Sequence, residues 1–275
     1  MIERPSPTLR VDCLARRHGV TARASRVIPE ETPVAFTYGG STHAVMMATP
    51  ADFEDFAVGF ALTEGLVDRP EDAGAVEIVA TELGVELRTW LGGDRQEAYA
   101  ARKRTMAGPT GCGLCGVESL EAATRQLPVL ENALAVSAEG LIDAMNRMPA
   151  EQKINQETRA VHAAAFWSPD SGALIVREDV GRHNALDKLA GALARQGVAA
   201  SQGVVLMTSR VSVELVQKAA RIGAPIIAAV SAPTALAVRS AEKCGMTLVA
   251  VMRGRDFEVF THPGRILEQV SAHVA

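Results

Sequence analysis

Three short apolar runs near the C-terminus constrain the fold of this chain more than any other feature. They are VVLM at 204–207, PIIAAV at 225–230 and TLVAVM at 247–252, and the segments between them, VELVQKAARIG and TALAVRSAEKCG, have helical spacing. Strands that are apolar on both faces and alternate with helices are typical of a parallel sheet covered by helices. The sequence therefore predicts an α/β domain in the C-terminal part of the chain.

The N-terminal part has a different pattern. Two strands are expected around Gly39-Gly40, a helix with phenylalanines on one face over 53–62, and half-buried strands between 75 and 105. We expect the first residues to be a loosely ordered lead-in, because they are polar and rich in turn formers. The expected domains are a lead-in at 1–29, an α+β domain at 30–107, a loop and helical connector at 108–150, and the α/β domain at 151–275.

The overall charge argues against a general affinity for nucleic acid or anionic membranes, because the formal net charge is −4. The first residues carry Arg, Pro and Asp where a secretory signal would need an unbroken apolar stretch. No apolar run is long enough to span a bilayer. We therefore expect a cytoplasmic protein, in which the four cysteines are too few for a disulfide scaffold.

Polar residues follow each of the three apolar runs, at the strand ends where open parallel sheets bind their ligands. Arginines and backbone N–H groups at helix starts would form a local site for phosphate groups. Serine, proline and threonine are also common at helix starts for purely structural reasons. The chain has no P-loop and no Rossmann glycine fingerprint. The polar residues are Thr208-Ser209-Arg210, Ser231-Ala232-Pro233-Thr234 and Arg253-Gly254-Arg255-Asp256.

Two cysteines, Cys112 and Cys115, lie three positions apart in a glycine-rich loop. Cys115 precedes a helical pattern, and a helix N-terminus favours the thiolate form of a cysteine. Three hypotheses fit: a carrier that holds sulfur as a persulfide, a dithiol oxidoreductase, and a zinc site. The zinc site would need further ligands from Cys13, Cys244, His43, His162 or His183. Zinc deaminase chemistry is excluded, because no histidine is followed two positions later by glutamate.

A second polar cluster, REDVGRHNALDKL at 177–189, covers the start of another expected helix. Two interpretations are open for it. The residues could belong to a capped surface helix with ordinary ion pairs, or they could have a functional role.

Several long motifs in one order resemble the FdhD family of sulfur carrier proteins required for formate dehydrogenase activity. They are CGLCG at 112–116, VHAAAF at 161–166, EDVGRHNALDK at 178–188, TSRVSVELVQKAA at 208–220, AAVSAPTALAV at 228–238 and TLVAVMRGRDFEVFT at 247–261. One departure is Thr158-Arg159-Ala160, where many members of this family have Thr-Gly-Gly. The resemblance covers nearly the whole chain.

The resemblance implies a sulfurtransferase whose C-terminal domain has a cytidine-deaminase-like fold. Its sulfur donor would be a cysteine desulfurase, and its acceptor would be the molybdenum cofactor, as bis(molybdopterin guanine dinucleotide), which formate dehydrogenase then receives. Cys112 would carry the persulfide and Cys115 would assist, with no metal of the protein's own. A non-catalytic cofactor chaperone stays an alternative, and homodimer formation is open. The predicted ligand-binding residues are Ser209, Arg210, Ser231, Thr234, Val251, Met252, Arg253, Gly254, Arg255 and Asp256.

Overall fold

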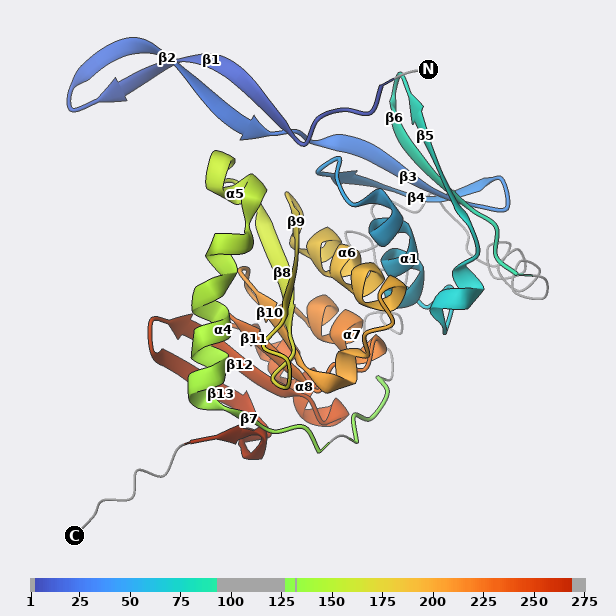
Figure 1. Ribbon diagram of the computed structural model, residues 1–275, viewed down its shortest axis with the longest axis vertical. Coiled ribbons are helices and arrows are strands. Elements are labelled where there is room, and N and C mark those ends of the chain that lie inside the picture. The colour runs from blue at the N-terminus through green and yellow to red at the C-terminus, as the bar shows by residue number, and fades with distance from the viewer. Residues whose placement is uncertain (1–2, 93–126, 132, 269–275) are drawn as a thin grey trace.

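The chain forms two stacked lobes and a projecting arm (Figure 1). The computed structural model describes residues 3–92, 127–131 and 133–268. Cys112 and Cys115 lie outside these residues. None of the described helices is long and apolar enough to cross a membrane.

The N-terminal lobe is a four-stranded sheet in the order β4-β3-β6-β5, with α1 packed on one face. Phe36 of the sheet stacks on Phe60 of α1, with ring centroids 4.0 Å apart, and meets Phe56 edge to face. These contacts confirm the predicted helix with its phenylalanine face. The antiparallel pairing of β3 with β4 confirms the strand pair around Gly39-Gly40. The elements are β3 (Thr32–Tyr38), β4 (Ser41–Ala48), α1 (Phe53–Thr63), η1 (Pro70–Ala73), β5 (Val76–Thr81) and β6 (Gly84–Thr89).

The C-terminal lobe is a six-stranded sheet in the order β13-β12-β11-β10-β8-β9. The predicted strands β10, β11 and β12 are parallel, as expected, whereas β8, β9 and β13 run antiparallel to their neighbours. The α/β fold class is thus confirmed, in a mixed sheet. The strands are β8 (His162–Trp167), β9 (Leu174–Asp179), β10 (Val204–Met207), β11 (Ile226–Ala229), β12 (Thr247–Arg253) and β13 (Asp256–Thr261).

Helices cover both faces of this sheet and create two cores. Side chains of α6, α7 and α8 pack with one face of the strands, and side chains of α4 pack with the other. A short parallel pair, β7 with β14, lies beside α4. The remaining elements are β7 (Val136–Ser137), α4 (Ala138–Glu151), α5 (Lys153–Thr158), α6 (Arg182–Arg195), η2 (Ala200–Gln202), α7 (Val213–Arg221), α8 (Ala235–Cys244), η3 (Pro263–Arg265) and β14 (Ile266–Leu267).

The N-terminal residues do not form the loosely ordered lead-in expected from the sequence. They form a regular antiparallel hairpin, β1 (Thr8–Arg17) and β2 (Val20–Pro29), which we call the arm. Its turn residues, His18 and Gly19, both have positive φ angles, of 50° and 85°. Two successive positive φ angles are typical of the tight two-residue turn that matches the twist of paired strands.

Two glycines bring α1 of the first lobe against α6 of the second. A Cβ atom on Gly59 would lie 1.7 Å from the carbonyl oxygen of Asp187, and one on Gly191 would lie 1.8 Å from that of Asp55. The two helix backbones are therefore in direct contact at this crossing. Any larger side chain at either glycine would push the lobes apart, because a packed backbone cannot yield by this amount.

Buried ion pairs flank the helix crossing on both sides. The Lys218 ammonium contacts Asp187 at 2.8 Å, and Thr63 of α1 donates to the same carboxylate at 2.6 Å. The Lys188 ammonium contacts Asp179 at 2.7 Å and donates to the carbonyl of Thr49 at 2.9 Å. Both ion pairs lie within the C-terminal lobe, and each also forms a hydrogen bond with a group of the N-terminal lobe. Removing one partner of such a buried pair typically costs about 3–5 kcal/mol.

The Thr158-Arg159-Ala160 departure falls at the end of α5. Arg159 has a left-handed backbone, with φ 58° and ψ 30°, and its N–H donates to the carbonyl of Asn155 at 2.8 Å. Glycine adopts this conformation without strain, whereas other residues lose roughly 1–2 kcal/mol. A glycine at position 159 would thus fit a helix end, which explains a glycine there without invoking a ligand.

Arg159→Gly should therefore stabilise the protein by about 0.5–1 kcal/mol, because the relief of strain exceeds the added entropy of the unfolded chain. Glu157→Gly is the matched control: it lies inside α5, where glycine costs about 1 kcal/mol. Urea unfolding of both variants checks the opposite signs. Destabilisation by Arg159→Gly would show that the arginine side chain contributes more than its backbone strain removes.

Candidate functional site

The loops after the three parallel strands meet at one edge of the sheet, which we call the carboxyl edge. Val211 bridges Pro233, and the N–H of Thr234 donates to the carbonyl of Val211 at 2.9 Å. The N–H of Val251 on β12 lies 3.5 Å from the carbonyl oxygen of Ser231. The structure thus brings the three predicted loops together, as the strand order required.

Three of the predicted ligand-binding side chains have structural roles. Ser209 is buried, and its hydroxyl donates to the carbonyl of Arg210 at 2.9 Å. The hydroxyl of Thr234 accepts from the N–H of Ala237 at 3.2 Å, so it caps α8. Met252 is 4% exposed and belongs to the core beneath α4. For Thr234, the helix-start interpretation is therefore the one that the structure supports.

The arginines of the carboxyl edge are exposed to solvent, unlike these buried residues. Arg210, Arg253 and Arg255 are exposed, as are Gly254 and Asp256, and Ser231 is half-buried. The turn between β12 and β13 is anchored to α4: Arg255 forms an ion pair with Glu139, and Asn146 donates to the carbonyl of Gly254 at 3.4 Å. Arg210 and Arg253 are thus available to an anion in a protein of negative net charge, whereas Arg255 is already paired with Glu139.

Val251 is the one strained residue of this edge. Its φ angle is +56°, a conformation that is a genuine outlier for a β-branched side chain. The pairing of β12 with β13 is irregular between Ala250 and Arg253, so the strain lies at a bulge. Strained backbone that persists in a well-packed fold is common at ligand sites. The strain at Val251 is therefore a second reason, independent of the arginines, to treat residues 251–256 as a candidate ligand site.

A cluster of ionisable side chains lies next to these loops, and it was not predicted from the sequence. His183 in the first turn of α6 has its Nε2 atom 3.4 Å from the Ser212 hydroxyl and 4.0 Å from the Glu214 carboxylate. Arg182 precedes it, and its Nε atom is buried without a hydrogen-bond partner in the described residues. The sequence held a signal for this cluster, because RHN at 182–184 and TSRVSVE at 208–214 each follow a strand.

Burial lowers the pKa of His183 to about 4, with the charges of Arg182 and Lys218 as further causes. The pKa of His162, at the start of β8, is also lowered, first by burial and then by Arg182. Both imidazoles are therefore neutral near pH 7. A neutral imidazole donates one hydrogen bond and accepts one, so it can form hydrogen bonds with a ligand without adding charge.

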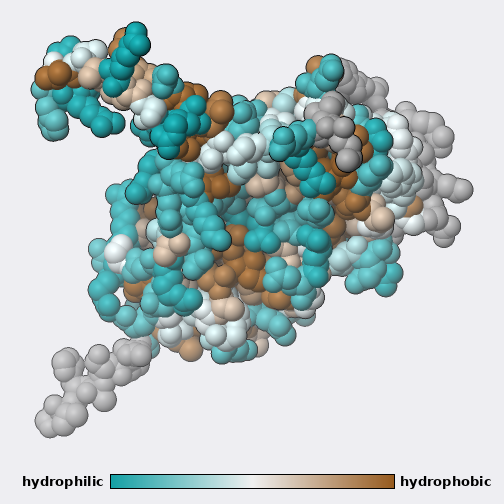
Figure 2. Space-filling view, turned by 45° about the horizontal axis from the view of Figure 1, so that its top comes forward, coloured by the Kyte–Doolittle hydropathy of each residue, from teal (hydrophilic) through white to brown (hydrophobic). Residues whose placement is uncertain are grey.

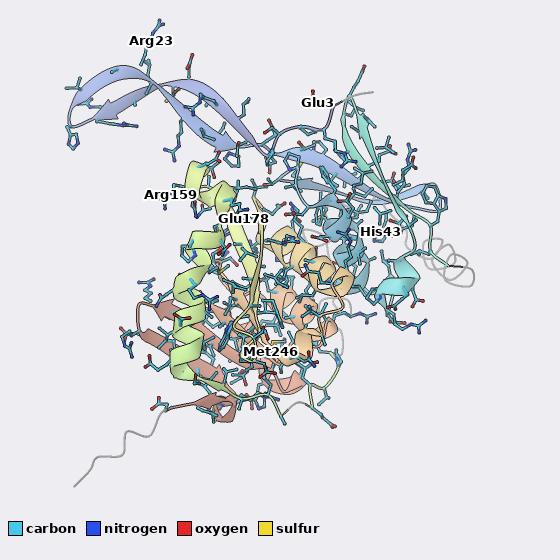
Figure 3. All side chains as sticks on the ribbon, in the orientation of Figure 1. Glu3, Arg23, His43, Arg159, Glu178 and Met246 are labelled. Atoms are coloured by element: carbon cyan, nitrogen blue, oxygen red, sulfur yellow. The ribbon has the colours of Figure 1, made fainter. Side chains whose placement is uncertain are left out.

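The polar cluster at 177–189 is not a surface helix with ordinary ion pairs. Asp179, Asn184, Asp187 and Lys188 are buried and hold the lobes together. Glu178 accepts from the N–H groups of Ile154 and Asn155, both at 2.8 Å, so it caps α5 (Figure 3 labels it). Within the motif, only Arg182 and His183 reach the carboxyl edge.

The two described residues that flank the cysteine segment lie away from the carboxyl edge. Gly92 follows β6 in the N-terminal lobe, and Leu127 lines a cavity of about 630 Å³ with Leu193 and Ile222, at the ends of α6 and α7. These helices begin at the carboxyl edge, so the cavity lies at the opposite, amino edge of the sheet.

The cysteines that the structure describes do not converge. Cys13 is exposed on the arm, and Cys244 is buried at the end of α8, on the far side of the molecule (Figure 1). Burial raises the pKa of the Cys244 thiol. Among the described residues, no three His, Cys, Asp or Glu side chains are grouped to hold a metal ion. The zinc hypothesis could therefore not combine Cys13 with Cys244.

Residues 29–267 match the model of the FdhD/NarQ family. The chain belongs to this family. Among curated proteins, the sulfur carrier protein FdhD of Agrobacterium fabrum is 52% identical over 259 residues, 94% of this chain and 96% of that protein. The protein of the same name from Bordetella petrii is 45% identical, over 95% of this chain and 96% of its own.

A crystal structure of a putative formate dehydrogenase accessory protein from Desulfotalea psychrophila shares the fold, with a TM-score of 0.72. It is 24% identical in sequence, and the match covers 94% of this chain and 99% of that one. The family match extends to both lobes, because it begins at the end of β2 and ends at β14.

The neutrality of His183 gives a prediction that spectroscopy can check. Its imidazole should stay unprotonated until the pH falls to about 4, and Arg182→Gln should raise this pKa because a nearby positive charge is removed. Arg239→Gln, which changes an exposed arginine on α8, is the control and should leave the pKa unchanged. NMR titration of the imidazole signals measures the pKa of His183 in all three proteins. A His183 that titrates near 6.5 in the wild type would contradict the burial argument.

Proposed function

We propose that the chain is a sulfur carrier that receives sulfur on Cys112 and delivers it to the molybdenum cofactor of a formate dehydrogenase. The observation that carries the proposal is membership of the FdhD/NarQ family, with relatives named sulfur carrier protein FdhD at 45–52% identity over nearly their full length. The CGLCG motif supplies the thiols that such a role needs. The protein would act in the cytoplasm.

In the loading step, the Cys112 thiolate attacks the outer sulfur of a persulfide on a cysteine desulfurase. A new S–S bond forms at Cys112 while the S–S bond of the donor breaks, and the donor leaves as a thiolate. No electrons are gained or lost overall, so the step needs no added oxidant or reductant. Cys115 is the assisting thiol of this step.

The carboxyl edge is the proposed binding place of the acceptor, bis(molybdopterin guanine dinucleotide), which is a substrate of the transfer. Exposed Arg210 and Arg253 suit its phosphate groups, and α7 begins three residues after Arg210 with its N-terminal N–H groups. The strained backbone at Val251 supports binding of the acceptor at the stretch 251–256. By contrast, the buried side chains of Ser209 and Met252 fit a supporting role.

Two other functions remain as alternatives, and both make different demands on the cysteines. A non-catalytic cofactor chaperone would use the arginines alone and would not need a reactive thiol. A dithiol oxidoreductase would need Cys112 and Cys115 equally, because each closes the disulfide. The carrier depends on Cys112 more than on Cys115, because Cys112 holds the sulfur.

Incubation with a cysteine desulfurase and cysteine should add one sulfur atom to the protein, and reductant should remove it. Peptide mapping should place the sulfur on Cys112, and Cys112→Ala should abolish both the added mass and formate dehydrogenase activation. Cys13→Ala, which removes an exposed thiol on the arm, is the matched control and should load normally. Intact mass spectrometry measures the loading of each variant.

Loading of Cys112→Ala to the wild-type level would refute the carrier proposal. Equal loss in Cys112→Ala and Cys115→Ala, together with a reversible disulfide in the wild type, would favour the oxidoreductase. Normal activation by Cys112→Ala would favour the chaperone.

A further inference from the structure

Arg182, the first residue of α6, has a buried Nε atom without a hydrogen-bond partner in the part of the chain that the structure describes. A buried donor that stays unpaired costs free energy, so native structures rarely keep one without a reason. The guanidinium group is also charged at any pH near neutral, which increases that cost. The Nε–H donor of Arg182 therefore indicates a partner outside the described residues.

Asp179, three residues before Arg182, already has a full set of partners. A carboxylate offers about four lone-pair sites, and four donors occupy them here. The donors are the N–H of Gly181 at 2.8 Å, the side-chain amide of Asn184 at 2.9 Å, the N–H of Thr49 at 3.0 Å and the Lys188 ammonium at 2.7 Å. Arg182 is therefore not one of the cations that hold the two lobes together.

Glu214 on α7 is a second carboxylate near Arg182, and it also has a partner of its own. The Ser212 hydroxyl donates to it, and the Nε2 atom of His183 lies 4.0 Å from it. Burial raises the pKa of Glu214, but the hydrogen bonds from Ser212 and from its own N–H bring this pKa below its usual value, and the charge of Arg182 acts in the same direction. Glu214 is therefore ionised near pH 7 and places one negative charge close to Arg182.

Two neutral imidazoles complete the surroundings of Arg182. His162 begins β8 and is paired in register with Asp179 on β9, and His183 follows Arg182 on α6. After burial, the charge of Arg182 is the next cause of the lowered pKa of both histidines, so the guanidinium lies close to both rings. Both side chains are half-buried. The site thus has one cation, one carboxylate and two rings that add hydrogen-bonding groups without charge.

This balance of charge favours a ligand with a single negative charge. The pyrophosphate group of a dinucleotide carries two, and Glu214 would repel it, whereas Arg210 and Arg253 offer it exposed cations. Half-buried donors suit an anion that is weakly hydrated, because little hydration is lost on binding. The terminal sulfur of a persulfide fits both conditions, since it carries one charge on a large atom. A neighbouring cation also favours the ionised form of a sulfhydryl group.

We propose that Arg182 and His162 bind the terminal sulfur anion of the carrier's cysteine persulfide during its delivery to the acceptor. The proposal rests on the proposed function and adds the place where the sulfur is held. The site binds the anion through N–H donors and itself forms no covalent bond to sulfur. The arm stands clear of the lobes above a largely hydrophilic surface (Figure 2), and both side chains are half-buried, so a ligand can reach them. Holding sulfur and acceptor at one edge orients the two reactants, which by itself accelerates a transfer.

Arg182→Gln separates delivery of sulfur from loading. The site acts after Cys112 has received its sulfur, so the variant should gain one sulfur atom from a desulfurase as the wild type does, measured by intact mass spectrometry. Activation of formate dehydrogenase by the loaded variant should fall at least about tenfold, the effect of losing one charge-assisted hydrogen bond. Arg239→Gln, which changes an exposed arginine on α8, is the matched control and should load and deliver normally. Circular dichroism should show that both variants fold.

The pH dependence of persulfide alkylation is a readout that a purely structural role of Arg182 would not change. The anion is the form that reacts with iodoacetamide, and a nearby guanidinium favours it. Arg182→Gln should therefore move the midpoint of the alkylation rate of loaded Cys112 upward by about one pH unit. His162→Ala removes a neutral group, so it should leave this midpoint unchanged and lower delivery at least about threefold. Peptide mass spectrometry measures the alkylation.

Normal loading and normal delivery by Arg182→Gln would overturn this proposal and leave the carrier function intact. So would an unchanged alkylation midpoint, or a loss of loading as large as the loss of delivery. Should Arg182→Gln fail to fold, normal delivery by His162→Ala would overturn the proposal by itself. A wild type that takes up no sulfur would refute the carrier function, and this site with it.

Discussion

The contact of two helix backbones at Gly59 and Gly191 determines how the rest of this structure is arranged. The absence of side chains there lets α1 lie directly on α6, so the first lobe rests on a helix of the second. Lys218 and Lys188 then reach carboxylates and carbonyl groups of both lobes in a dry environment. Buried ion pairs of this kind add specificity more than stability, since each ion loses its hydration. Their hydrogen bonds to Thr63 and Thr49 form only when the two lobes meet in this one way.

This arrangement has a direct consequence for the carboxyl edge. The helix that carries Asp187 and Lys188 into the interface begins with Arg182 and His183, and the helix that carries Lys218 begins beside Ser212. The starts of α6 and α7 are therefore fixed by contacts deep in the interface. The edge receives preorganised groups: exposed arginines, two neutral imidazoles and a strained residue at Val251. Preorganisation matters for an anion site, because the binding energy is then not spent on ordering the protein.

The sequence predicted the parts of the fold that depend on local patterns. The strands of the parallel sheet are short and apolar on both faces, and α1 carries its phenylalanines at helical spacing, so both could be identified. The arm was missed because its arginines reduced the apolar signal, although TLRVDC alternates polar and apolar residues. The role of the 177–189 cluster could not be predicted, because its partners Thr49 and Thr63 are more than 120 residues away. Sequence also could not tell Thr234, which caps a helix, from Arg210, which is free to face a ligand.

The central claim is that the two lobes form one cooperative unit, closed by the α1–α6 contact and its buried ion pairs. Native-state hydrogen exchange of the α1 amides tests this most directly, because it reports the free energy of the smallest opening that exposes them. The account predicts that amides near Gly59 exchange only through global unfolding, with the same free energy as the central amides of α6 and β10. Exchange of α1 at a clearly lower free energy, with α6 still protected, would show that the N-terminal lobe opens by itself and would contradict the account.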